Sequence, residues 1–191
     1  MTNHHLVKQK TKHMIRKMSD GMSQWSSKMP FPKDRYTVRC IEEEFAPSKA
    51  GNPMFTRVFE IVSPSTVEVG EKTIGVAGLK LTQYRTVKVK DQVTKEWDAE
   101  KSDKAWGGFR DELLIAGFDP EQEVDDENPP NFFLNKMFDA VIYGKKVPST
   151  KSPTPEQIKK GERYGDVIKD ADGNDIVTYQ LNLDSIVGPA A

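Results

Sequence analysis

The sequence predicts a mainly β domain, an antiparallel β-barrel, closed or partly open, with one inserted α-helix and a flexible N-terminal arm. Apolar and polar residues alternate along most segments from residue 33 onward, as in strands that bury one face. Only one long segment has the three-to-five-residue apolar spacing that favours a helix. At 191 residues, the chain has the length of one domain with extensions.

Residues 1–32 form the predicted arm. Met14, Ile15 and Met18 have loosely helical spacing, but Gly21 and two later prolines interrupt any helix. The arm is basic, because a single acid, Asp20, opposes Lys8, Lys10, Lys12, Arg16, Lys17 and Lys28. We expect such a segment to attract DNA nonspecifically or to bind a neighbouring protomer.

The domain, residues 33–191, begins with two predicted strands. Residues 35–45 alternate between apolar and polar side chains, and residues 54–62 are rich in aromatic and β-branched residues. Between them, residues 46–53 contain the Pro, Gly and Asn that are typical of turns. The two strands are therefore predicted to form a hairpin.

Further strands are predicted within residues 66–69 and 73–90, followed by a helix at residues 102–118. We expect Ser102 to cap the start of this helix and Gly117 to end it. The apolar positions that indicate the helix are Trp106, Phe109, Leu113, Leu114 and Phe118.

An acidic linker, residues 119–130, precedes a strand at 137–147 and an exposed loop at 149–162. The sequence then predicts a closing hairpin between residues 166–169 and 175–183. Strands, one helix and more strands in this order fit the five-stranded oligonucleotide/oligosaccharide-binding (OB) barrel better than a parallel α/β fold.

No group of residues indicates catalysis. The three histidines, His4, His5 and His13, all lie in the arm, without Cys or carboxylate partners at metal-ligand spacing. Residues 170–174 start like a calcium-binding loop, but Leu181 stands where that loop needs a bidentate Glu. We therefore expect no enzymatic activity, no metal site and no cofactor.

The single cysteine, Cys40, is predicted to be a buried thiol, because it lies in an alternating apolar run. No stretch approaches the roughly 18 to 20 apolar residues of a membrane span. We expect no membrane partner and a cytoplasmic location.

Charge is segregated along the chain despite a net charge of −1. Residues 80–90 contain basic residues and no acid, whereas residues 121–127 contain acids and no base. Single-strand binders combine cations for phosphates with rings that stack on bases, at about 1–3 kcal/mol per base. The predicted phosphate contacts are Arg35, Arg39, Lys49, Arg57, Lys80, Arg85, Lys88 and Lys145. The predicted stacking rings are Tyr36, Phe55, Tyr84 and Tyr143.

The same interleaving also arises when any half-buried sheet places rings inside and cations outside. Arg57 shares a predicted strand face with Phe55 and Phe59, and an arginine there indicates a face that is not wholly buried. Phe59 and Trp106 are assigned to the core.

Several motifs resemble those of bacteriophage-encoded single-stranded DNA-binding proteins of the OB-fold type, over about residues 33–185. They are Tyr36-Thr37-Val38-Arg39, Ser48-Lys49-Ala50-Gly51-Asn52-Pro53-Met54, Phe59-Glu60-Ile61, Phe109-Arg110 to Gly117-Phe118, and Phe138-Asp139-Ala140 to Gly144-Lys145. The resemblance implies sequence-independent coating of single-stranded DNA in phage replication or recombination, with replication or recombination proteins as further partners. For a phage-encoded protein, the expected cytoplasmic location is the cytoplasm of the host cell.

Many such proteins recruit partners through an acidic tail, whereas the last residues here are Asp184-Ser185-Ile186-Val187-Gly188-Pro189-Ala190-Ala191. We therefore do not expect recruitment through a tail of that kind. The alternative function is a structural or interaction protein, such as a virion β-barrel or sandwich component, that binds no nucleic acid.

Overall fold

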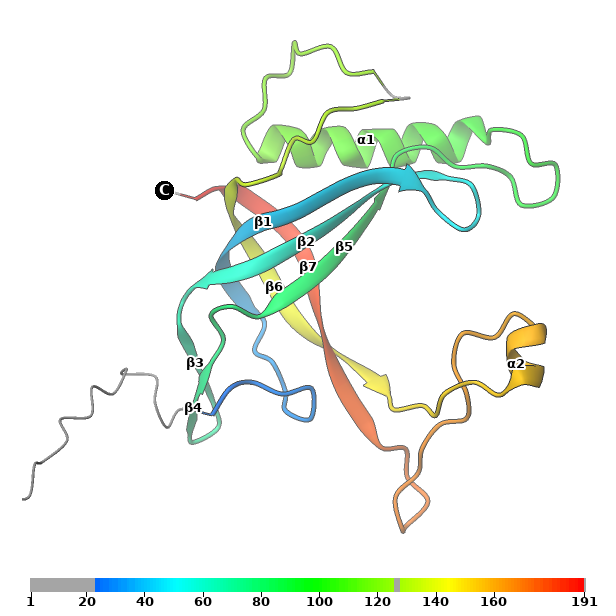
Figure 1. Ribbon diagram of the computed structural model, residues 1–191. Helices are drawn as coiled ribbons and strands as arrows, with labels where there is room; N and C mark the ends of the chain where they lie inside the picture. The colour runs from blue at the N-terminus through cyan, green and yellow to red at the C-terminus, as the bar shows by residue number, and fades with distance from the viewer. Residues whose placement is uncertain (1–22, 126–127, 191) are drawn as a thin grey trace, which may run out of the picture.

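A curved antiparallel sheet is the main element of the computed structural model, which describes residues 23–125 and 128–190 (Figure 1). The strand order is β5-β2-β1-β6-β7. These strands are β1 (Asp34–Pro47), β2 (Pro53–Ser63), β5 (Lys80–Thr86), β6 (Met137–Pro148) and β7 (Val177–Pro189). The short strands β3 (Thr66–Val69) and β4 (Lys72–Gly75) form a separate ribbon, and the helices are α1 (Ala99–Ile115) and α2 (Pro155–Lys159). The mainly β prediction is confirmed.

The sheet curls because β1 is long enough to pair with two partners. The N-terminal part of β1 pairs with β6, and most of the length of β1 pairs with β2. The edge strands β5 and β7 approach each other, and α1 packs against both. Within β1, the pairing slips between Cys40 and Glu42, so that Tyr36, Val38 and Cys40 point inward before the bulge and Glu43 after it.

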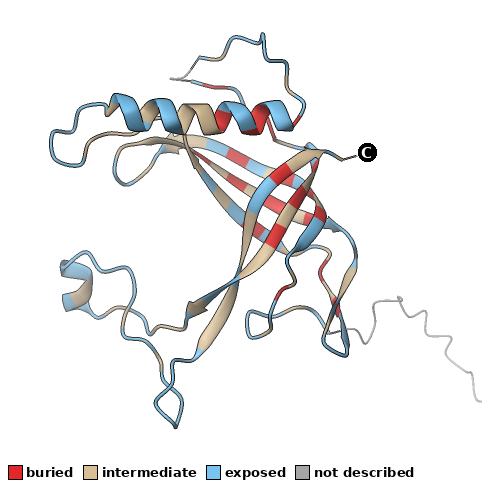
Figure 2. Ribbon diagram, turned by 180° about the vertical axis from the view of Figure 1, so that it is seen from behind, coloured by how far each residue is buried: buried red, intermediate tan, exposed pale blue. Residues whose placement is uncertain are grey.

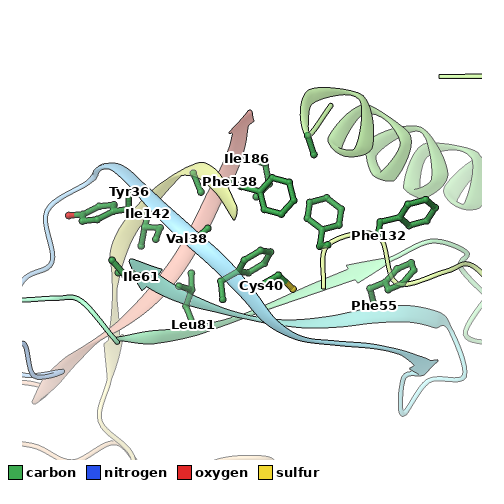
Figure 3. Close-up of a cluster of buried hydrophobic side chains, with 14 of the residues drawn as sticks. Tyr36, Val38, Cys40, Phe55, Ile61, Leu81, Phe132, Phe138, Ile142 and Ile186 are labelled. Atoms are coloured by element: carbon green, nitrogen blue, oxygen red, sulfur yellow. The ribbon is translucent and has the colours of Figure 1, made fainter. Parts of the chain in front are cut away.

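The core lies inside this curl and beneath α1 (Figures 2 and 3). Phe55 on β2 stacks on Phe109 of α1, with ring centroids 5.1 Å apart. Phe132 and Phe133, in the segment between α1 and β6, extend the same aromatic cluster. Cys40 and Phe59 are fully buried as predicted, and the half-buried Trp106 packs against the core.

Helix α1 starts earlier than predicted. Asp98, not Ser102, is the N-cap, and its carboxylate accepts a hydrogen bond from the backbone N–H of Lys101 (3.0 Å). Ser102 instead exchanges hydrogen bonds with the backbone of Val89, which ties the helix to the segment after β5. Gly117 follows the helix with φ = 83°, as expected for the residue that ends it.

The described part of the predicted arm, residues 23–32, packs against the domain, so the boundary at residue 33 is wrong. Phe31 is buried, and the Trp25 ring meets it edge-on with centroids 5.5 Å apart. Trp25 also donates its backbone N–H to the carbonyl oxygen of Gly75 (3.0 Å). The rest of the arm, residues 1–22, lies outside the described residues.

The predicted exposed loop at residues 149–162 is the first part of the β6–β7 connection, residues 149–176, and contains the short helix α2, which has no buried residue. Thr154 and Gln157 form a capping box at the start of this helix. Beyond it, Gly173 adopts φ = 82° in a turn whose flanks are joined by a bridge between Lys169 and Asp175. Among the described helices, none is long and apolar enough to cross a membrane.

Candidate nucleic-acid interface

Three predicted DNA contacts, Tyr36, Phe55 and Arg57, are buried in the core, so their assignment was wrong. Tyr36 donates its hydroxyl to the carbonyl oxygen of Pro32 (3.1 Å), and burial raises the pKa of Tyr36 to about 12. Phe55 is enclosed between β2 and α1. All side chains that point inward from β2 are buried, including the charged side chain of Arg57.

Arg57 can be buried because two carboxylates, those of Glu43 and Glu112, are buried beside it and neutralise its charge. Its Nε donates to Glu43 of β1 (2.8 Å), and one terminal nitrogen donates to Glu112 of α1 (2.8 Å). Glu43 also accepts the backbone N–H groups of Phe133 (2.8 Å) and Leu134 (3.1 Å). A buried cation is tolerated when it is paired and hydrogen-bonded in this way. Arg57 therefore joins β1, β2 and α1 and has a structural role.

The network continues outward to a cleft of ≈ 370 Å³ between β5, β7 and α1. Arg85, a predicted phosphate contact, donates to Glu112 (3.2 Å) and to the backbone oxygen of Gly108 (2.9 Å). Gln83 also donates to Glu112 (2.7 Å). Arg85 is half-buried and committed to α1, so its charge is largely balanced.

The other predicted contacts reach the surface but do not form one patch. Arg39 forms an ion pair with Glu60 of β2 (2.8 Å). Glu60 in turn lies opposite Lys80 of β5 in the sheet. Arg35 and Lys145 are exposed on β1 and β6. Tyr143 of β6 is half-buried beneath the ammonium group of Lys33, 5.8 Å from the ring centroid.

One ring and two cations do gather, just beyond the end of β5. Tyr84 points outward from β5 opposite Thr56 and is 66% exposed. Beyond the strand, the Trp97 ring is 45% exposed, and the ammonium groups of Lys88 and Lys90 lie 5.0 and 4.7 Å from its centroid. We group these residues with Lys49, in the adjacent β1–β2 turn, as the β5 surface: Lys49, Tyr84, Lys88, Lys90 and Trp97.

Backbone contacts hold the turn of Lys49 beside Lys90. Asn52 accepts the backbone N–H of Lys90 through its side-chain oxygen (2.8 Å). Gly51 adopts φ = 80°, and a Cβ at this position would come within 3.8 Å of the Lys90 ammonium nitrogen. The β1–β2 turn and the segment after β5 are therefore in direct contact.

A tight hairpin presents Trp97. Lys90 and Trp97 form a β-bridge, and the Asp91 carboxylate accepts the backbone N–H groups of Val93 and Thr94 (both 2.8 Å). These bonds lower the pKa of Asp91, with Thr94 contributing most. Asp98 pairs with Lys101 (2.7 Å), which lowers the pKa of Asp98. Two acids of this segment are thus engaged locally.

Sequence reasoning missed Trp97 and did not assign Lys90 a role. The available signal was the acid-free run of residues 80–90 with a tryptophan shortly after it. What the pattern did not reveal is the hairpin, because the pairing of Lys90 with Trp97 depends on how residues 91–96 turn.

Within residues 23–125 and 128–190, no group of three or more His, Cys, Asp or Glu side chains could hold a metal ion. Comparisons of the chain with known proteins found no matching family model, curated protein or solved structure. The function of the chain is therefore inferred from the geometry of the β5 surface.

Proposed function

We propose that this protein is a non-enzymatic, sequence-independent binder of single-stranded DNA, built on an OB-like barrel. The strand order supports the barrel: β1 pairs with β2 and β6, β2 with β5, β6 with β7, and the two edges β5 and β7 approach each other. Helix α1 lies between β5 and β6, the third and fourth of these five strands along the chain. It packs against the edge strands β5 and β7.

The position of the β5 surface supports the DNA proposal. OB folds bind oligonucleotides on their second and third strands and on the loops after the first and fourth strands. Here these elements are β2, β5, the β1–β2 turn and the β6–β7 connection. Figure 1 shows that the turn, the segment after β5 and the connection with α2 project toward the same side of the molecule.

The observation that carries the proposal is the exposed Trp97 ring beside two ammonium groups. Single-stranded DNA offers an unpaired base and a phosphate within one nucleotide, which matches a ring next to a cation. A cation–π contact at an exposed site contributes about 0.5–1 kcal/mol. Base stacking on a ring contributes about 1–3 kcal/mol. A base therefore displaces the lysines from the ring, and they move to the phosphates.

Stacking is tolerant of sequence, since every base has a flat face. The β5 surface thus suits coating of any exposed strand. A role in phage replication or recombination, with proteins of those processes as partners, belongs to the same proposal and is supported by the motif resemblance alone.

The test is a salt titration of binding to fluorescent oligo-dT, followed by anisotropy with the full chain. Three lysines that neutralise phosphates of a single strand give a slope of log K against log salt of about −2. Trp97→Ala and Lys90→Ala variants bind more weakly, and Lys72→Ala, on the remote β3–β4 ribbon, is the matched control for the charge lost in Lys90→Ala. A salt-independent affinity would contradict the proposal.

Gel shifts on single-stranded and duplex DNA distinguish this function from its alternative. The proposal requires retardation of the single strand in preference to the duplex. A structural or interaction protein without affinity for nucleic acid retards neither.

A further inference from the structure

A second hollow, ≈ 190 Å³ in volume, lies between α1 and the segment that follows it. Its walls are mostly apolar, formed by Trp106, Leu113, Leu114, Phe118, Val124 and Phe132. Leu114 is 41% exposed although it belongs to this apolar wall. We call this hollow the α1 groove. It shares no residue with the β5 surface, although Trp106 and Val124 of its wall also line a neighbouring hollow with Lys88.

Acids are frequent in the segment after α1 that forms one wall of the α1 groove. Asp119 lines it directly, and Glu121, Glu123 and Asp125 follow within the same exposed segment. One basic residue, Arg110, also lines it. A ligand suited to this groove therefore combines apolar side chains with several positive charges.

We propose that the α1 groove binds the basic N-terminal segment, residues 1–22, of a second copy of this chain. That segment combines Met14, Ile15 and Met18 with Lys8, Lys10, Lys12, Arg16 and Lys17. Apolar side chains fill the groove, and the flanking cations meet the acids of the segment after α1. In the part of the chain before residue 23, Asp20 is the only acid.

The positions of donor and groove favour a second copy over the same chain. The described chain begins beside β4, where Gln24 pairs with Gly75, whereas the α1 groove lies at the opposite end of the molecule (Figure 1). At about 3.6 Å per residue, the nine residues from Met14 to Ser23 reach about 32 Å when fully extended. β2, which runs between the two ends, is 11 residues and therefore about 36 Å long.

A donor at one end and an acceptor at the other produce a head-to-tail contact. Such contacts are heterologous, and they build open arrays unless a rotation closes them into a ring. Combined with the proposed DNA binding, the array would make coating cooperative. The docking itself is independent of DNA and is tested without it.

Sedimentation velocity of the full chain, from about 1 to 100 µM, measures the docking. We expect the weight-average sedimentation coefficient to rise with concentration and a free peptide of residues 1–22, in excess, to reverse the rise. Leu114→Asp places a charge in the apolar wall and weakens association about tenfold or more. Ile115→Asp is the matched control, since Ile115 is 49% exposed on the same helix but lines the other cleft.

A second, charge-based pair of variants keeps the test decisive if Leu114→Asp unfolds the chain. A chain with both Glu121→Lys and Glu123→Lys associates more weakly. Association is restored when this chain is mixed with a second chain that carries both Lys12→Glu and Arg16→Glu. A chain that stays monomeric over the whole concentration range overturns the proposal, and so does equal association of the Leu114→Asp and Ile115→Asp variants. Loss of oligo-dT binding with association intact refutes the DNA function alone.

Discussion

The guanidinium carbon of Arg57 lies 3.8 Å from the centroid of the Phe133 ring, inside the core. Glu43 and Glu112 flank the same guanidinium, and one of its terminal nitrogens has no hydrogen-bond partner. The arginine is therefore held between a ring from the loop before β6 and carboxylates from β1 and α1. This arrangement fixes α1 against the sheet, and with it the segment that carries Trp97.

Replacing this arginine should be costly. Arg57→Met leaves the buried carboxylates of Glu43 and Glu112 without their shared cation, and breaking a buried pair costs about 3–5 kcal/mol. We expect the free energy of unfolding, measured by urea denaturation, to fall by that amount. Adding Glu43→Gln recovers part of the loss, because a neutral amide needs no cation.

Arg39→Ala is the control for Arg57→Met. Arg39 makes an ion pair of the same length with Glu60, but on the surface. Exposed pairs contribute about 1 kcal/mol or less. Equal losses for the two variants would show that burial of the Arg57 network has no energetic consequence.

Gly144→Ala should loosen the packing of residues 23–32 on the domain. A Cβ at position 144 would lie 2.9 Å from the Cβ of Phe31 and 3.0 Å from its backbone nitrogen. Because backbone atoms are involved, Phe31 must move away, and overpacking of this kind costs about 1–3 kcal/mol. Faster amide hydrogen exchange at residues 25–31 is the expected readout. Gly107→Ala is the control, since a Cβ there meets nothing.

Stability should fall at alkaline pH because two buried acids resist ionisation. Burial raises the pKa of Cys40 from 9.0 and that of Tyr36 from 10.0, each to about 12. Above about pH 9 the unfolded chain loses these protons while the folded chain keeps them, so unfolding becomes progressively more favourable up to about pH 12. Urea midpoints at pH 8 and 11 measure the effect. Tyr36→Phe should reduce the drop.

Tyr84→Ala should weaken binding to oligo-dT by the value of one stacked ring, about 1–3 kcal/mol. Tyr164→Ala is the comparison variant, because both rings are 66% exposed but Tyr164 lies in the β6–β7 connection, the other proposed contact element, outside the β5 surface. Anisotropy titrations of the two variants at equal salt give the comparison. A larger loss for Tyr164→Ala would place the binding surface on the connection instead.

The local sequence pattern predicted the strands well, because alternation reports directly which face of a strand is buried. Residues 35–45, 54–62 and 66–69 correspond closely to β1, β2 and β3. The pattern failed at the start of α1, since Asp98 and Ser102 are both good caps and only contacts with Val89 distinguish them. It also failed for Phe31, whose burial depends on the distant strand β6.

The sequence by itself determined the mainly β architecture, the single long helix and the burial of Cys40, because each follows from side chains that are near one another in the chain. The tertiary structure decided which charged and aromatic residues face water. Arg57 is buried because Glu43 and Glu112 arrive from distant elements to neutralise it. Trp97 becomes a surface feature because a hairpin sets it beside Lys88 and Lys90. Pairing of this kind depends on three-dimensional proximity, which alternation along one strand does not encode.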